Sequence, residues 1–163
     1  MNLIVAVDQN WAIGRGGDQL CYIPADLKRF KALTMGHAVI AGRKTLAAFP
    51  GGRPLPGRRC LLLSHQEELN VPGAEVFSDV EALLKAAPED AFVVGGESVY
   101  RQLLPACDTA YVTKIDAAFP ADRFFPNLDA LPDWEIVSEE TPPACDGLSF
   151  RYVTYRRKAE KPL

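Results

Sequence analysis

Residues Ala38–Thr45 read AVIAGRKT, an apolar run that ends in glycine and is followed at once by Arg and Lys. Residues Ala91–Ser98, AFVVGGES, repeat the pattern of an apolar run, glycine and a polar segment. Each stretch predicts a buried strand that opens into a helix, and the free N–H groups and partial positive charge of a helix N-terminus suit a phosphate. Glycine at the junction lets the backbone approach a ligand closely. Either stretch alone is better explained as an ordinary strand–helix turn, but the pair favours a ligand with more than one phosphate, such as a dinucleotide.

The alternation of strands and helices continues along most of the chain. Apolar runs predict strands at Leu3–Val7, Ala38–Gly42, Cys60–Ser64, Glu75–Phe77, Ala91–Gly95 and Ala110–Ile115, and helices are predicted at Pro24–Leu33, after Gly42 through Ala48, at Asp79–Ala87 and at Ser98–Leu104. Such alternation is typical of a parallel sheet. Trp134–Glu139 and Ser149–Tyr155 instead alternate apolar and polar residues, as half-exposed antiparallel strands do. We therefore predict the α/β class, with a mixed, mostly parallel sheet, an antiparallel C-terminal hairpin and helices on both faces.

Three segments do not fit regular structure. Residues 8–22 form a predicted loop that is long for a compact domain, and such loops are often functional. Residues 50–57, PGGRPLPG, are too rich in Pro and Gly for a helix or a strand. Residues 158–163 are predicted to be a frayed tail, which leaves a single domain over residues 1–157.

The composition limits the classes of function. With 163 residues, 48% of them hydrophobic, the chain is long enough to bury a core of its own. The net charge of −3 argues against a nucleic-acid partner and a polybasic membrane anchor, and we expect no membrane span or signal peptide. The cysteines form no CxxC pair and the chain has 2 histidines, so we expect free thiols, no metal site and a cytoplasmic location.

Asp26 stands in the first turn of the predicted helix at Pro24–Leu33. Helical spacing places Ile23, Leu27 and Phe30 on one apolar face, and Lys28, Arg29 and Ala32 away from it. From spacing alone, Asp26 is best explained by a favourable interaction with the helix dipole. The alternative is a carboxylate that faces a pocket, where burial would raise its pKa and the helix N-terminus would lower it. Such a carboxylate matches a guanidine-like edge with parallel N–H donors, and Thr113 is a candidate to donate a hydrogen bond to it.

A series of short blocks resembles the dihydrofolate reductases in order and spacing. The blocks are Ile13–Gly14, Ile23–Phe30, Gly42–Thr45, Arg53–Arg58, Val93–Gly96, Val99–Tyr100, Tyr111–Ile115 and Asp122, and the resemblance runs from Leu3 to about Arg157. It implies a single-domain mixed sheet of eight strands with about four flanking helices. It also implies reduction of 7,8-dihydrofolate to 5,6,7,8-tetrahydrofolate by hydride transfer from NADPH.

For the substrate, the resemblance implies two catalytic residues. Asp26 would bind the 2-amino group and N3 of the pterin, and Thr113 would orient Asp26 and a structural water, while an ordered water would supply the proton to N5. Substrate contacts are implied for Ile4, Val5, Ala6, Cys21, Leu27, Phe30, Phe49, Leu55, Arg58, Val94, Tyr100 and Thr113. Arg58 would pair with the α-carboxylate of the glutamate tail, a role that suits a planar guanidinium. Outside this resemblance, the apolar residues are ordinary core and Arg58 is a solvated loop residue.

For the cofactor NADPH, the resemblance implies contacts on both glycine junctions and on the lid. They fall at Ala6, Ile13, Gly14, Leu20, Gly42, Arg43, Lys44, Thr45, Leu63, Ser64, His65, Gly95, Gly96, Glu97, Ser98, Val99 and Tyr100. The helix starts would hold the pyrophosphate, and Arg43, Ser64 and His65 would meet the 2′-phosphate that distinguishes NADPH from NADH. On its own, His65 would be a surface histidine. The peptide between Gly95 and Gly96 is expected to be cis, and residues 9–22 to form a lid over the nicotinamide.

The chain departs from the family pattern at a few positions. Leu20-Cys21 stands where the family usually has Pro-Trp, which changes the packing of the lid and the water beside Asp26. Glu97 and Ser98 follow the glycine pair where a third glycine and, in some members, Arg are found, and Ala121 replaces a Gly of some members. Two alternatives stay open: a reductase of the same fold that acts in riboflavin synthesis, and a folate- or nucleotide-binding protein without activity. We expect a monomer.

Overall fold

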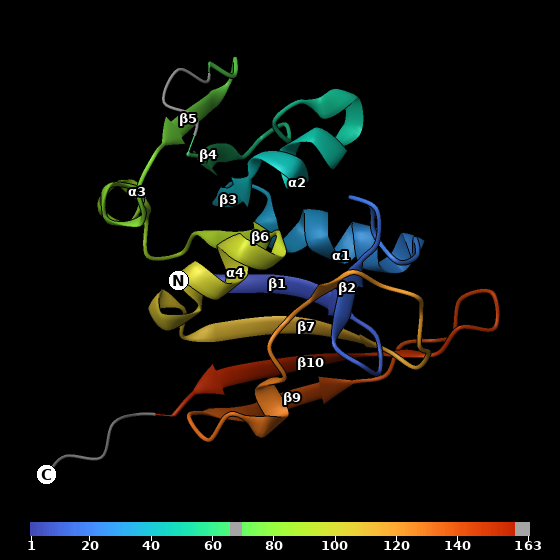
Figure 1. Ribbon diagram of the computed structural model, residues 1–163. Coiled ribbons are helices and arrows are strands. Elements are labelled where there is room, and N and C mark those ends of the chain that lie inside the picture. The colour runs from blue at the N-terminus through green and yellow to red at the C-terminus, as the bar shows by residue number, and fades with distance from the viewer. Residues whose placement is uncertain (66–69, 159–163) are drawn as a thin grey trace, which may run out of the picture.

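The computed structural model describes residues 1–65 and 70–158, which fold around one eight-stranded sheet (Figure 1). The strands follow the spatial order β5-β4-β3-β6-β1-β7-β10-β9. Their bounds are β1 Asn2–Val7, β3 Ala38–Gly42, β4 Arg59–Leu63, β5 Ala74–Phe77, β6 Phe92–Gly95, β7 Thr109–Ile115, β9 Trp134–Glu140 and β10 Phe150–Arg157. All pairs from β5 to β7 are parallel, whereas β10 pairs antiparallel with both β7 and β9. The predicted mixed sheet with an antiparallel C-terminal hairpin is confirmed.

Four α-helices connect the strands, and each begins close to its predicted position. They are α1 Pro24–Thr34, α2 Arg43–Ala48, α3 Val80–Ala86 and α4 Glu97–Leu103, and short 3-10 turns lie at η1 Pro50–Gly52, η2 Leu104–Ala106 and η3 Leu128–Ala130. Asp79 caps α3 by accepting a hydrogen bond from the backbone N–H of Ala82 at 2.8 Å. The segment 50–57, predicted to be irregular, contains the single turn η1 because Pro is tolerated at the start of a helix.

The helices cover both faces of the sheet, as predicted. Successive side chains of a strand point to opposite faces, so the partners of neighbouring residues reveal which helix covers which face. In β4, Leu61 packs in the core that includes residues of α3 and α4, whereas Leu62 packs with Leu46 of α2. In β7, Val112 belongs to the same core as α4, whereas its neighbour Thr113 meets α1. Helices α1 and α2 therefore lie on one face, and α3 and α4 on the other.

The prediction of a plain loop over residues 8–22 is wrong in part. The segment contains the short strand β2 Ala12–Gly14 (Figure 1), and this strand pairs antiparallel with β8 Arg123–Phe124. The buried Asp8 organises the turn before β2, since its carboxylate accepts hydrogen bonds from the N–H groups of Ala12 and Phe119, each at 2.9 Å. Strands of two or three residues leave no periodic pattern in the sequence, and their pairing depends on a partner more than 100 residues away.

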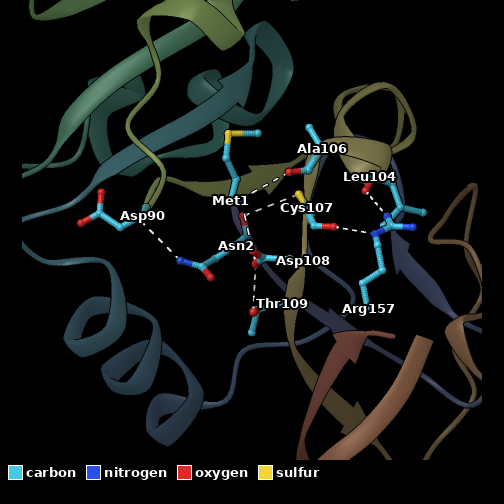
Figure 2. Close-up of polar contacts among 9 residues, drawn as sticks. All are labelled: Met1, Asn2, Asp90, Leu104, Ala106, Cys107, Asp108, Thr109 and Arg157. Carbon is cyan, nitrogen blue, oxygen red and sulfur yellow. Dashed lines mark hydrogen bonds and ion pairs between the residues drawn. The ribbon is translucent and has the colours of Figure 1, made fainter. Parts of the chain in front are cut away.

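The amino ends of β1 and β7 meet the last residue of β10 in a polar cluster (Figure 2). The guanidinium of Arg157 donates hydrogen bonds to the carbonyls of Leu104 at 2.7 Å and Cys107 at 3.0 Å. The N-terminal ammonium donates to the carbonyl of Ala106 at 3.3 Å, and the Cys107 thiol lies 3.9 Å from the carbonyl oxygen of Asn2. The turn η2 and the residue that follows it are thereby fixed to the end of β10 and to the start of the chain at β1.

Candidate active site

The two glycine junctions singled out in the sequence lie side by side. Strands β3 and β6 are parallel neighbours, and Ala41 pairs with Gly95, so both strands end at the same edge. A Cβ atom on Gly42 would lie 3.0 Å from Val99 Cγ2, and one on Gly95 would lie 3.4 Å from Thr45 Oγ1 and 3.3 Å from the Tyr100 ring. A side chain from the start of α4 thus lies against the glycine that ends β3, and one from the start of α2 lies against the glycine that ends β6. Gly95 has a φ of +125°, which disfavours any side chain, and its peptide bond to Gly96 is cis.

At this double junction, formed by the starts of α2 and α4, some charged side chains form ion pairs within the protein and others do not. Arg43 and Lys44 are exposed at the start of α2, and neither forms an ion pair with any described residue. Glu97 at the start of α4 is neutralised by an ion pair with Arg101, at 3.5 Å between Oε1 and Nη2. The net charge offered at the junction is therefore positive.

The end of β4 extends the same edge. Gly42 pairs with Leu63 across β3 and β4, so Ser64 and His65 follow directly beside the start of α2. Leu63 is buried and His65 is exposed. Arg43 and His65, which are far apart in the sequence, are thus brought to one region of the surface.

Asp26 lies in the first turn of α1, on the opposite side of β1 from the junction. Its Oδ1 atom accepts a hydrogen bond from the hydroxyl of Thr113 in β7 at 2.5 Å, which confirms the predicted contact. Burial raises the pKa of Asp26 above its ordinary value, and the Thr113 hydroxyl and the charge of Arg29 offset this effect only in part. The carboxylate is thus held in one orientation and is more easily protonated than an exposed Asp.

Apolar side chains near Asp26 are less buried than a packed helix face would be. Leu27 is 43% exposed and Phe30 is half-buried, whereas Ile23 is 4% exposed. The predicted apolar face therefore carries one buried, one half-buried and one exposed residue. Arg29, predicted to lie away from that face, contacts the sheet instead of solvent alone, because its guanidinium carbon sits 4.0 Å from the centre of the Tyr152 ring. Helix α1 rests on the sheet through polar and cation–π contacts and leaves apolar surface open next to its acid.

Comparison with known proteins shows to which family the chain with these residues belongs. The family model described as Dihydrofolate reductase matches residues 1–157. The chain belongs to the dihydrofolate reductase family. It is 41% identical to a dihydrofolate reductase of Mycobacterium leprae (strain TN), over 96% of this chain and 98% of that protein, and 35% identical to one of Bacillus subtilis (strain 168), over 97% and 95%. A solved dihydrofolate reductase from Enterococcus faecalis, complexed with NADP(H) and RAB-propyl, is 33% identical with a TM-score of 0.87 and covers 97% of this chain and 96% of that one.

Within this dihydrofolate reductase fold, residues 9–22, the predicted lid, are anchored to the segment before β8. The N–H of Gly16 donates to Asp122 Oδ2 at 3.0 Å, and the N–H of Asp122 donates to the carbonyl of Gly14 at 3.0 Å. A Cβ atom on Gly14 would lie 2.8 Å from the carbonyl oxygen of Asp18, so this close approach requires glycine. Ile13 and Leu20 are half-buried within the same segment.

Cys21 lies near the end of the predicted lid, residues 9–22, and five positions before Asp26 in the sequence. It is half-buried against Ile115, Phe150 and Tyr152. Burial, Asp26 and Asp8 together raise the pKa of its thiol above the ordinary value, so Cys21 is protonated at neutral pH and is a poor nucleophile.

The remaining predicted substrate residues fall into two groups. Ile4 and Val5 are buried in the sheet, and Ala6, Phe49, Leu55 and Val94 are half-buried. The buried hydroxyl of Tyr100 donates to the carbonyl of Ile4 at 2.6 Å, which links α4 to β1. Arg58 is half-buried, and its guanidinium donates to the carbonyl of Pro56 at 3.0 Å and to the Thr34 hydroxyl at 3.2 Å. A guanidinium carries five N–H groups, so Arg58 is fixed in place with donors to spare.

A separate open cavity of about 540 Å³ lies between the turn after β1 and strand β10. Its lining includes Trp11, Lys114 and Asp129, and it contains none of the predicted site residues. Lys114 is bound to Asp129 at 2.7 Å, so its charge is already used within the protein.

The sequence did not single out two residues that contribute to the site. Tyr152 is the cross-strand partner of Thr113, and Arg29 packs on its ring. The strand at Ser149–Tyr155 was predicted, but its register against β7 was not, and this register decides which residue stands beside Thr113.

Proposed function

We propose that the protein is a dihydrofolate reductase that reduces 7,8-dihydrofolate to 5,6,7,8-tetrahydrofolate with NADPH, and so supplies one-carbon metabolism. One observation carries the proposal beyond family membership: a partly buried carboxylate, fixed by Thr113, lies two strands away from a paired glycine junction with free basic side chains. An acid for the pterin and a phosphate site for the cofactor then flank β1, where Ala6 pairs with Thr113.

The substrate half of the proposal assigns the pterin to Asp26. Two carboxylate oxygens match the parallel N–H donors of the 2-amino group and N3, and Thr113 holds the carboxylate in that orientation. The proton for N5 arrives through an ordered water, because Asp26 is engaged with the other edge of the pterin. Leu27, Phe30, Phe49, Leu55, Ile4, Val5, Ala6, Val94, Cys21 and Tyr100 bound the ring and the aminobenzoyl group, and Arg58 binds the glutamate tail through its remaining N–H groups.

The cofactor half assigns the pyrophosphate to the double junction. Gly42, Gly95 and Gly96 leave the backbone accessible, and the starts of α2 and α4, with Arg43, Lys44, Thr45, Glu97, Ser98 and Val99, supply the N–H groups and charge. Arg43, Ser64 and His65, beside Leu63, bind the 2′-phosphate. Bound NADPH supplies the hydride. Ala6, Ile13, Gly14, Leu20 and Tyr100 border the nicotinamide, and the lid excludes water from it.

The proposal also includes a monomer that works in the cytoplasm without a nucleic-acid partner, in keeping with the net charge of −3. Among the described residues, no helix is long and apolar enough to span a membrane. As a dihydrofolate reductase, the protein would be a target of antifolates. Size-exclusion chromatography with light scattering tests the monomer.

The decisive test follows the absorbance of reduced nicotinamide with purified protein, NADPH and dihydrofolate, with NADH in parallel. We expect rapid oxidation that depends on dihydrofolate and prefers NADPH. Oxidation that requires a pyrimidine of riboflavin synthesis instead would move the protein to the other reductase of this fold. Binding of both ligands without turnover would identify a non-catalytic binding protein.

A further inference from the structure

Two residues of α1 meet two residues of the sheet that stand side by side. Asp26 and Arg29 are three positions apart and so lie on one face of the helix. Thr113 in β7 and Tyr152 in β10 are directly paired across antiparallel strands and project from the same face of the sheet. Asp26 bonds Thr113 at 2.5 Å, and the guanidinium carbon of Arg29 lies 4.0 Å from the centre of the Tyr152 ring. The two contacts form a matched pair between one helical turn and one strand pair.

This pair of contacts fixes a helix whose apolar side chains are only partly buried. Thr34 is the one residue within the bounds of α1 that is fully buried, and Leu27 is 43% exposed. Tyr152, in contrast, is 8% exposed and provides a rigid platform from the sheet. A cation over the face of a buried aromatic ring is attracted by the electron density of the ring, and a planar guanidinium also stacks on it.

The charged and titratable groups that face Asp26 come from three elements. Arg29 is on its own helix, Cys21 is on the segment before it, and Tyr152 is on β10. Burial raises the pKa of both the Cys21 thiol and the Tyr152 phenol, and the charge of Asp26 raises each further, so both groups are neutral near pH 7. Asp8 and Glu140 act on Cys21 and Tyr152 respectively. Arg29 is therefore the one cation among the described groups that act on Asp26.

We propose that Arg29, fixed on the ring of Tyr152, is a positioning residue that places positive charge beside Asp26 and thereby keeps its carboxylate ionised for the substrate. Without this charge, burial would favour the protonated acid, which offers one acceptor oxygen fewer to parallel N–H donors. The ring matters because a free arginine side chain samples many rotamers and would carry its charge into solvent. The inference rests on the proposed function for its link to substrate, but the electrostatic part is independent of turnover.

The experiment compares matched variants of the full-length, ligand-free protein by ¹³C NMR titration of the Asp26 carboxyl, which is assigned with Asp26→Asn. In Arg29→Met we expect the titration midpoint to rise, equivalent to a several-fold increase in proton affinity. Arg29→Lys should stay near the wild type, since it keeps the charge. Lys28→Met removes one charge from the neighbouring exposed position and should leave the midpoint unchanged. Arg29→Gln is the second charge-removing variant, and circular dichroism checks that each variant is folded.

A second series tests the ring. Tyr152→Phe keeps the aromatic ring under Arg29 and should leave the titration midpoint of Asp26 at the wild-type value, apart from the effect of losing the phenol hydroxyl. Tyr152→Leu removes the ring and should raise the midpoint, as Arg29→Met does, but by a smaller amount. Equal midpoints in Arg29→Met and Lys28→Met would overturn the proposal, and a wild-type midpoint in Tyr152→Leu would overturn the role of the ring.

The link to substrate is tested separately through the dissociation constant of dihydrofolate as a function of pH. As the pH is lowered, dihydrofolate binding should begin to weaken at a higher pH in Arg29→Met than in the wild type. At alkaline pH, both proteins should bind dihydrofolate equally well. A weakening at the same pH in both proteins would overturn the link. Wild-type protein that fails to bind dihydrofolate would contradict the proposed function, while the NMR titration would still decide the role of Arg29.

Discussion

The two ends of the central strands are built in opposite ways. At the amino ends of β1 and β7, polar groups bind one another: Arg157 donates to two backbone carbonyls and the N-terminus to a third (Figure 2). At the carboxyl ends, Arg43 and Lys44 are exposed without an ion pair to any described residue, and Asp26 is held by one hydroxyl. In open α/β sheets, ligands bind beyond the carboxyl ends of the strands.

The contrast indicates that stability and function are separated along the strands. The polar groups at the amino ends contribute to folding because each is satisfied within the protein. Asp26 opposes folding instead. The pKa of Asp26 is raised in the folded state, so the carboxyl group ionises less readily in the folded than in the unfolded protein. The free energy of unfolding therefore falls as the pH rises from the ordinary Asp pKa through the raised pKa of the folded state. Changes at the two ends should therefore have opposite effects.

The largest effect is expected for Asp26→Asn. Asn keeps an acceptor oxygen for Thr113 but replaces the second oxygen, the partner of the pterin, with a donor, so kcat/KM for dihydrofolate should fall by about 10²–10⁴-fold. NADPH affinity should stay nearly unchanged. The ligand-free variant should melt at a higher temperature than the wild type at pH 7, and the gain should shrink as the pH falls towards the ordinary Asp pKa. Steady-state kinetics and thermal melts at several pH values measure both.

Asp133→Asn is the matched control, since it changes an exposed carboxylate on the surface. It should leave both kinetics and melting temperature near the wild type. Full activity of Asp26→Asn at neutral pH would refute the role of the acid, and a lower melting temperature would refute its cost to folding.

Arg157→Met tests the opposite end. It removes two charge-assisted hydrogen bonds to backbone carbonyls and a guanidinium that lies 4.7 Å from the centre of the Trp134 ring. We expect a loss of about 2–4 kcal/mol in the free energy of unfolding, measured with urea, and unchanged kcat/KM below the transition. The exposed neighbour Arg156 provides the control Arg156→Met. A fall in kcat/KM in Arg157→Met would show that the two ends are coupled.

Arg43→Ala tests the free charge at the double junction. A phosphate contact from a charged donor is worth about 1.5–3 kcal/mol, so the variant should bind NADPH about 10–100-fold more weakly. Binding of NADH, which lacks the 2′-phosphate, should weaken far less. The free energy of unfolding should also change far less than the free energy of NADPH binding. The dissociation constants of both cofactors, measured by fluorescence, decide the point. Equal losses for the two cofactors would place Arg43 elsewhere than at the 2′-phosphate.

The strands that flank the glycine junctions could be predicted because their signals are local. The strand Ala38–Gly42 was predicted with its observed bounds, since the apolar run is continuous and glycine ends it. The hydrogen bond from Thr113 to Asp26 joins residues 87 positions apart. That contact followed from the family resemblance and the chemistry of the two side chains, because spacing cannot reveal a contact between elements.

What escaped prediction depends on register and on very short pairing. From spacing alone, the exposed Leu27 shares a face with the buried Ile23, and helical periodicity does not tell a core from an open site. The contact of Arg29 with the sheet was not predicted, because its partner, Tyr152, is defined only once β10 has paired with β7. The strand β2 was missed because its three residues pair with β8 across the fold.

The smallest effect is expected within that lid segment, for Tyr22→Phe. The Tyr22 hydroxyl donates to Asp18 Oδ1 at 2.7 Å, but both groups are exposed, and the ring of Tyr22 is 61% exposed. Water replaces such a bond readily, so kcat/KM should change by less than about twofold. Asp122→Asn, which alters the acceptor for the Gly16 N–H, should have the larger effect, since that bond joins the lid to the segment before β8. Equal effects of the two variants on kcat/KM would mean that hydrogen bonds within the lid position it as much as the bond to Asp122 does. The carboxyl end of the sheet would then contain an element whose structure depends on its own contacts.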